Sequence, residues 1–100
     1  MLNFVVIEKH SMVGVNGEQA YYSITDAKRN KNWILQYNTT LPQIVHYALG
    51  YVEALDLNYT IYFHESISQT ELDQALGFCY GERITEKELK RRQDILKTVG

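Results

Sequence analysis

The chain has 100 residues, a formal net charge of −2, 45% hydrophobic residues and 22% charged residues, which is ordinary for a globular protein and excludes a disordered chain. Cys79 is its only cysteine, so no disulfide can form within the chain. The N-terminal apolar run is too short for a signal peptide, and no stretch reaches the roughly 18 apolar residues that span a bilayer. We therefore expect one cytoplasmic domain over residues 1–100, without a membrane contact.

Charge is distributed unevenly along the chain. No Lys or Arg occurs between Lys31 and Arg83, and residues 32–82 carry a net charge of −6. Residues 1–31 sum to +1 and residues 83–100 to +3, which together restore the total of −2. A sustained field of one sign is informative about binding partners rather than about the fold.

The first third of the chain predicts an antiparallel meander of three strands. Residues 4–7 form an apolar run without alternation, which is typical of a strand covered on both faces, and residues 12–15 continue it after an interruption at residues 9–11. Asn16-Gly17 is a strong hairpin signal because both residues tolerate positive φ. Residues 19–25 and 32–38 alternate between apolar and polar side chains, as strands do.

A helix is predicted over residues 42–55, with Pro42 in its first turn, where a missing N–H is tolerated. Its apolar residues fall within an arc of roughly 140°, which indicates a face turned to the core. They are Ile44, Val45, Ala48, Leu49, Val52 and Leu55. Residues 59–64 alternate again and predict a fourth strand.

Two short helices are predicted at residues 69–79 and 86–98, each with a marked start. Ser68 with Glu71, and Thr85 with Glu88, match the capping-box spacing. A turn through residues 80–82 would separate the helices, and Cys79 would lie buried on the apolar face of the first. The predicted fold is α+β: an antiparallel four-stranded sheet in the chain order β-β-β-α-β, one helix packed on a face, and two short C-terminal helices.

No pattern in the sequence indicates catalysis or a cofactor. The candidate metal ligands are His10, His46, His64 and Cys79, and no two of them have a ligand spacing. No phosphate-binding glycine motif is present, and no serine or cysteine has a base at a recognisable spacing. We therefore expect a protein that is not an enzyme and that holds neither a metal nor a cofactor.

The leading hypothesis is a small protein-binding module with an acidic surface. In the predicted helix 42–55, Tyr47, Gly50, Tyr51 and Glu53 lie on the side away from the core. Aromatic anchors in a negative field suit a basic protein partner. Such a module could inhibit or regulate a nucleic-acid-handling protein, and the small size and many Asn and Tyr residues are compatible with a phage or mobile-element protein.

Two alternatives remain open. The first is a DNA-binding regulator that uses residues 69–98 as a helix-turn-helix-like pair, with nucleic-acid contacts from Lys87, Lys90, Arg91 and Lys97. Ion pairs between Glu86 and Lys90 and between Glu88 and Arg92 would instead make this helix an ordinary solvated one, and a pI of 5.9 is low for a DNA reader. The second alternative is a homo-oligomeric structural module.

Overall fold

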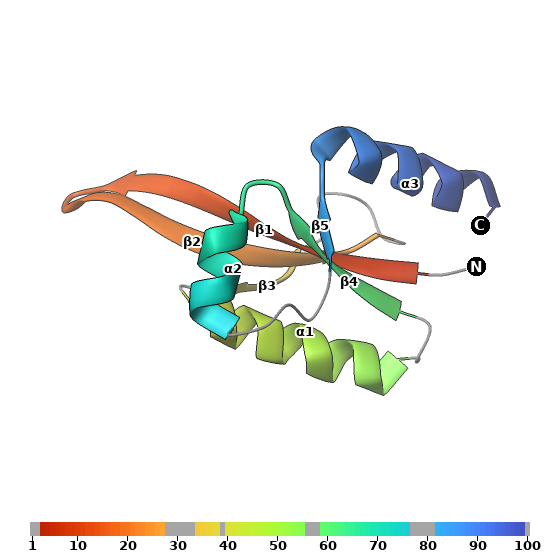
Figure 1. Ribbon diagram of the computed structural model, residues 1–100, viewed down its shortest axis with the longest axis horizontal. Coiled ribbons are helices and arrows are strands. Elements are labelled where there is room, and N and C mark those ends of the chain that lie inside the picture. Colours follow the sequence, from red (N-terminus) through yellow and green to blue (C-terminus); the bar gives the residue numbers. More distant parts are fainter. Residues whose placement is uncertain (1–2, 28–33, 39, 56–58, 77–81, 100) are drawn as a thin grey trace.

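The computed structural model describes residues 3–27, 34–38, 40–55, 59–76 and 82–99, and confirms the α+β class (Figure 1). In chain order the elements are β1 (Asn3–Gly14), β2 (Gly17–Asp26), β3 (Ile34–Asn38), α1 (Leu41–Leu55), β4 (Tyr59–His64), α2 (Gln69–Leu76), β5 (Glu82–Ile84) and α3 (Glu86–Val99).

The sheet is mixed, so the prediction of a purely antiparallel sheet was wrong. Its strand order is β3-β2-β1-β4-β5. β1 pairs antiparallel with β2, and β2 with β3, as the meander predicted. β4, however, pairs parallel with β1. The reason is that α1 returns the chain across the sheet, and a strand that follows such a crossover enters in the same direction as its neighbour.

A fifth strand, β5, lies where the sequence predicted a turn and the residues just before the cap of the last helix. β5 pairs parallel with β4, with His64 opposite Ile84. Three residues are too few for an alternation pattern, which is why the strand went unpredicted. Residues 77–81, including Cys79, lie outside the described residues, and the burial of Cys79 stays a prediction.

Two apolar clusters lie on opposite faces of the sheet, because successive side chains of a strand alternate between faces. The first cluster joins β1, β2 and β4 to α1 and α2, and contains Val5, Ile7, Tyr22, Ile24, Leu41, Ile44, Val45, Ala48, Ile61, Phe63, Ile67 and Leu72. The second, smaller cluster joins the sheet to α3, and contains Phe4, Val6, Ala27, Ile84 and Leu89. Figure 1 shows α1 and α3 on the two sides of the sheet.

The predicted face of α1 is largely confirmed. Ile44 and Ala48 are fully buried against the sheet, whereas His46 and Glu53 on the opposite side are exposed. Val52 is only half-buried, at the margin of the first cluster. Tyr51 departs from the prediction, because its half-buried ring also packs against that cluster.

Each capping box is formed through the N-cap side chain. The N–H of Glu71 donates to Ser68 Oγ at 3.1 Å, and the N–H of Glu88 donates to Thr85 Oγ1 at 3.2 Å. The two glutamate carboxylates instead accept hydrogen bonds from Lys9 and from Arg92. The sequence signature therefore predicted both helix starts correctly. The carboxylates of Glu71 and Glu88, however, bind other side chains and not the N-cap N–H groups.

β1 and β2 extend beyond the body of the molecule as a two-stranded arm, residues 8–21 (Figure 1). Their pairing is continuous from Val5 opposite Asp26 to Gly14 opposite Gly17. The expected interruption at residues 9–11 was therefore wrong. The predicted turn is present, and Gly17 has a φ of 104°. β4 accompanies β1 only as far as Ile7, so the arm continues without it.

Candidate functional site

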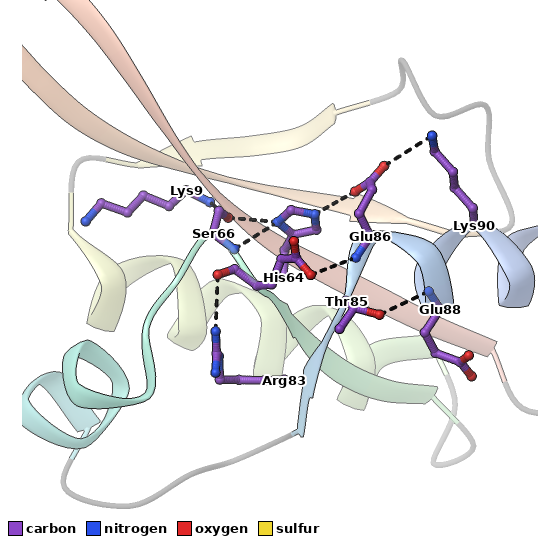
Figure 2. Close-up of polar contacts among 9 residues, drawn as sticks. Lys9, His64, Ser66, Arg83, Thr85, Glu86, Glu88 and Lys90 are labelled. Atoms are coloured by element: carbon purple, nitrogen blue, oxygen red, sulfur yellow. Dashed lines mark hydrogen bonds and ion pairs between the residues drawn. The ribbon is translucent and has the colours of Figure 1, made fainter.

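His64, at the carboxyl end of β4, is the centre of a polar cluster (Figure 2). Its Nε2 lies 2.6 Å from Glu86 Oε2, and its Nδ1 lies 2.9 Å from Ser66 Oγ. The N–H of Ser66 also donates to Nδ1, at 3.1 Å. In the neutral ring the proton is therefore on Nε2, and it is donated to Glu86. The imidazole thus joins the end of β4 to the first turn of α3.

Further bonds connect this cluster to β1 and β5. Ser66 Oγ accepts the backbone N–H of Lys9 at 3.0 Å, and Glu65 Oε2 accepts the N–H of Glu86 at 3.2 Å. Arg83, on β5, donates through Nε to the carbonyl oxygen of Ile67 at 2.8 Å. Figure 2 shows the contacts of His64, Ser66 and Glu86 converging around the turn that follows β4.

The order hydroxyl, imidazole, carboxylate in this cluster is that of an activated nucleophile. Here, however, Ser66 Oγ also accepts a hydrogen bond from Lys9, and His64 Nδ1 also accepts one from Ser66's own N–H. An adjoining open hollow of about 430 Å³ is lined by Lys9, His10, Ser11, Glu18, Ala20 and Ser66. Its cation, Lys9, is paired with Glu71 rather than aimed at a reacting oxygen. We interpret the cluster as a set of structural contacts that hold β1, β4 and α3 together. The absence of enzyme activity stays a prediction.

Lys9, Glu71 and Tyr22 form a second polar group, where α2 meets the base of the arm. Lys9 Nζ lies 2.8 Å from Glu71 Oε1, and the Tyr22 hydroxyl donates to Glu71 Oε2. Burial, and then the bond to Glu71, raise the pKa of Tyr22 to about 12. Burial alone would raise the pKa of Glu71, but the bonds from Lys9 and Tyr22 outweigh it and leave this pKa below its usual value.

The tip of the arm carries exposed apolar side chains. The exposed fractions are 55% for Met12, 87% for Val13 and 105% for Val15. Residues 11–20 are all exposed, and Glu18 is the only charged residue among them. An apolar group of this kind at the end of a projecting element is typical of a contact surface.

The predicted tyrosine surface on α1 is present only in part. Tyr47 is 39% exposed and Glu53 is exposed. Apart from the backbone of α1 and the two residues flanking Gly50, no atom of the described residues lies within 4 Å of where a Cβ at Gly50 would stand. Tyr51 is half-buried, and its hydroxyl donates to Asp26 Oδ2 at 2.7 Å. Tyr51 therefore serves the fold, and partner binding by this surface stays a prediction.

The basic residues of α3 are largely engaged in ion pairs. The predicted pairs Glu86–Lys90 and Glu88–Arg92 are confirmed at 3.9 Å and 2.9 Å. Arg91 also binds Glu88, and the hydrogen bonds from Arg91 and then Arg92 lower the pKa of Glu88 to about 2. Lys87 is exposed, and the side chain of Lys97 lies outside the described residues.

The helix-turn-helix geometry was wrong, because β5 lies between α2 and α3. The two helices also bury their apolar residues in different clusters, Leu72 in the first and Leu89 in the second. Direct nucleic-acid binding by the basic side chains of α3 remains an untested prediction.

Comparison of the chain with protein-family models, with curated proteins and with solved structures found no match. Within the described ranges, no helix has both the length and the apolar character to cross a membrane. Among the same residues, no group of three or more His, Cys, Asp and Glu side chains could hold a metal ion.

Proposed function

We propose that this domain is a protein-interaction module whose contact element is the β1–β2 arm. The observation that carries the proposal is the exposure of Met12, Val13 and Val15 at the tip. Leaving apolar surface in water costs about 25 cal/mol per Å², so three such side chains within four positions favour a role in binding.

The base of the arm is well fixed, which supports a presenting role. A two-stranded hairpin is marginally stable in water by itself. Here the Lys9–Glu71 ion pair ties one face of the arm to α2. On the other face His10 Nε2 lies 2.7 Å from Ser23 Oγ, and the His10 ring stacks on Tyr21 at 4.9 Å. A partner would thus meet a tip that projects from a fixed base, which lowers the entropic cost of binding.

The arm is favoured over the acidic surface for two reasons. Lys9 already neutralises Glu71 in space, so the acidic stretch is less uniformly negative than its sequence implies. Tyr51, one of the two expected aromatic anchors, is engaged with Asp26. An acidic regulator that binds a basic, nucleic-acid-handling protein therefore has weaker support from the geometry than an interaction through the arm.

A photo-crosslinking amino acid placed at Val13 tests the proposal in cells. The matched control carries the same amino acid at Glu53, which is exposed on α1. We expect an adduct of one discrete mass from position 13 and none from position 53. Absence of any adduct from Met12, Val13 and Val15, or equal adducts from the arm and from Glu53, would overturn the proposal.

A further inference from the structure

We infer that the partner of the arm is a second copy of this chain, an inference that rests on the proposed function. In this arrangement the outer edge of β1 pairs antiparallel with the same edge of the second copy, about a two-fold axis at Met12. The two arms then form a continuous four-stranded ribbon in the order β2-β1-β1-β2, and the two bodies lie at its opposite ends. Such an isologous contact closes on itself as a dimer.

The backbone of β1 presents a usable edge at this point. The N–H of Lys9 points away from β2, because it donates to Ser66 Oγ. With the period of two along a strand, the N–H and C=O groups of Ser11 and Val13 point to the same edge. β4 does not reach them, since its pairing with β1 ends at Ile7. A two-fold axis at Met12 sets Ser11 opposite Val13 of the second copy, and so pairs these groups in both directions.

The usual protections of a strand edge are missing from this part of β1. Natural edges are shielded by charged side chains, by proline or by bulges. Residues 11–17 contain no charged residue and no proline, and the register from Val5 to Gly14 has no bulge. Lys9, the nearest cation on this strand, has its charge directed to Glu71.

Charge and shape favour a second copy as the occupant. Pairing about Met12 joins residues 11–13 of the two copies, and these residues carry no charge, so no like charges lie opposite each other. Ser66, bonded to the N–H of Lys9, marks where the pairing ends. Antiparallel pairing also brings the apolar tip of each arm to the base of the other. There the hollow of about 430 Å³, lined by Ala20 and Ser66 among others, adjoins Lys9. Met12 and Val13 are covered in the same contact.

Solution mass tests this inference on the purified protein. We expect the wild type to shift from monomer to dimer with rising concentration in sedimentation equilibrium. Met12→Asp places two carboxylates across the axis and should weaken the dimer at least tenfold, with an unchanged circular dichroism spectrum. Gln43→Asp, an equal charge change at an exposed position of α1, should leave the dimer intact. A wild type that stays monomeric up to its solubility limit, or equal effects of the two variants, would overturn the inference.

Disulfide trapping tests the register. In a Cys79→Ser background, Met12→Cys should form an intermolecular disulfide rapidly, because residues at the axis face each other within disulfide reach. Glu53→Cys should not, and equal rates at the two positions would contradict the arrangement. If the purified protein is monomeric while Val13 still yields a cellular adduct to another protein, this inference fails and the proposed function stands. If no adduct forms either, both fail.

Discussion

The buried carboxylate of Asp26 needs hydrogen-bond donors, and Tyr51 and Tyr59 supply them. The Asp26 side chain is buried at the end of β2, and both the Tyr51 and Tyr59 hydroxyls donate to its Oδ2, at 2.7 and 3.2 Å. Burial of a carboxylate is costly unless hydrogen bonds replace its lost hydration. Tyr51 comes seven residues, almost two full turns, after Ile44, so the helical period places it beside the core face of α1 and its assignment to the opposite side was wrong. The sequence does not show that Asp26 lies within its reach.

Tyr51→Phe should therefore reduce the free energy of unfolding by about 1–3 kcal/mol, because Asp26 loses a donor while the ring still packs. Tyr47→Phe is the matched control on the same helix, and its more exposed hydroxyl should matter by less than about 0.5 kcal/mol. Urea unfolding monitored by circular dichroism measures both. Equal losses in the two variants would show that the bond to Asp26 contributes nothing.

Tyr22 and Glu71 make the stability of the fold dependent on pH at both extremes. The pKa of Tyr22 rises from 10.0 to about 12 on folding, so its contribution is complete below pH 10 and is lost as the pH rises towards 12. Tyr22→Phe should flatten the stability profile over that window. The pKa of Glu71 is lowered instead, so its contribution is present above pH 4.5 and is lost in more acidic solution. Denaturant melts across pH 9–12 measure the loss of stability in alkaline solution. An unchanged slope in Tyr22→Phe would contradict this account.

At the scale of elements, local signals were predictable and long-range pairings were not. The Asn16-Gly17 turn, both capping serine and threonine residues and the apolar face of α1 follow from neighbouring residues, and the structure contains them. The parallel pairing of β4 with β1 joins segments far apart in the chain, and no periodicity specifies it. The polar residues at 9–11 suggested an interruption, but most of the arm beyond Ile7 faces solvent, where a strand tolerates polar side chains on both faces.

Two glycines should respond to alanine in opposite directions. Gly17→Ala forces a side chain into positive φ and should destabilise the arm by about 1 kcal/mol. Gly50→Ala fills open space in the middle of α1 and should raise the free energy of unfolding by up to about 1 kcal/mol through helix propensity. Urea melts report the global change, and amide hydrogen exchange reports the arm. A loss of stability in Gly50→Ala would mean that another part of the protein packs against α1 at Gly50 and leaves no room for a methyl group.

Across the whole molecule, the charge pattern of the chain is a poor guide to its surface. The acidic stretch looked unopposed in sequence, yet Lys9, from the N-terminal part of the chain, pairs with Glu71. The basic helix α3 likewise balances Lys90, Arg91 and Arg92 with its own glutamates. Of the candidate site, the hairpin turn was predictable, but the projection of the arm was not, because it depends on where β3 and β4 stop pairing.

The two apolar clusters should differ in how firmly they hold their helices. α1 packs into the larger first cluster. Among the side chains that the structure describes, α3 contributes Leu89 to the smaller second cluster and is otherwise joined through polar contacts such as Arg92 with Tyr62 and Glu86 with His64. Local opening costs less where fewer apolar groups are buried, so α3 should detach while the first cluster remains folded. Leu89→Ala should accordingly reduce amide protection in α3 far more than in α1.

Ile44→Ala, the matched truncation in the first cluster, should cost about 2–5 kcal/mol of global stability and lower protection in every element that opens only by global unfolding. Hydrogen exchange read by mass spectrometry separates the two patterns, and equal loss of protection in α1 and α3 after Leu89→Ala would show that the two faces unfold as one unit.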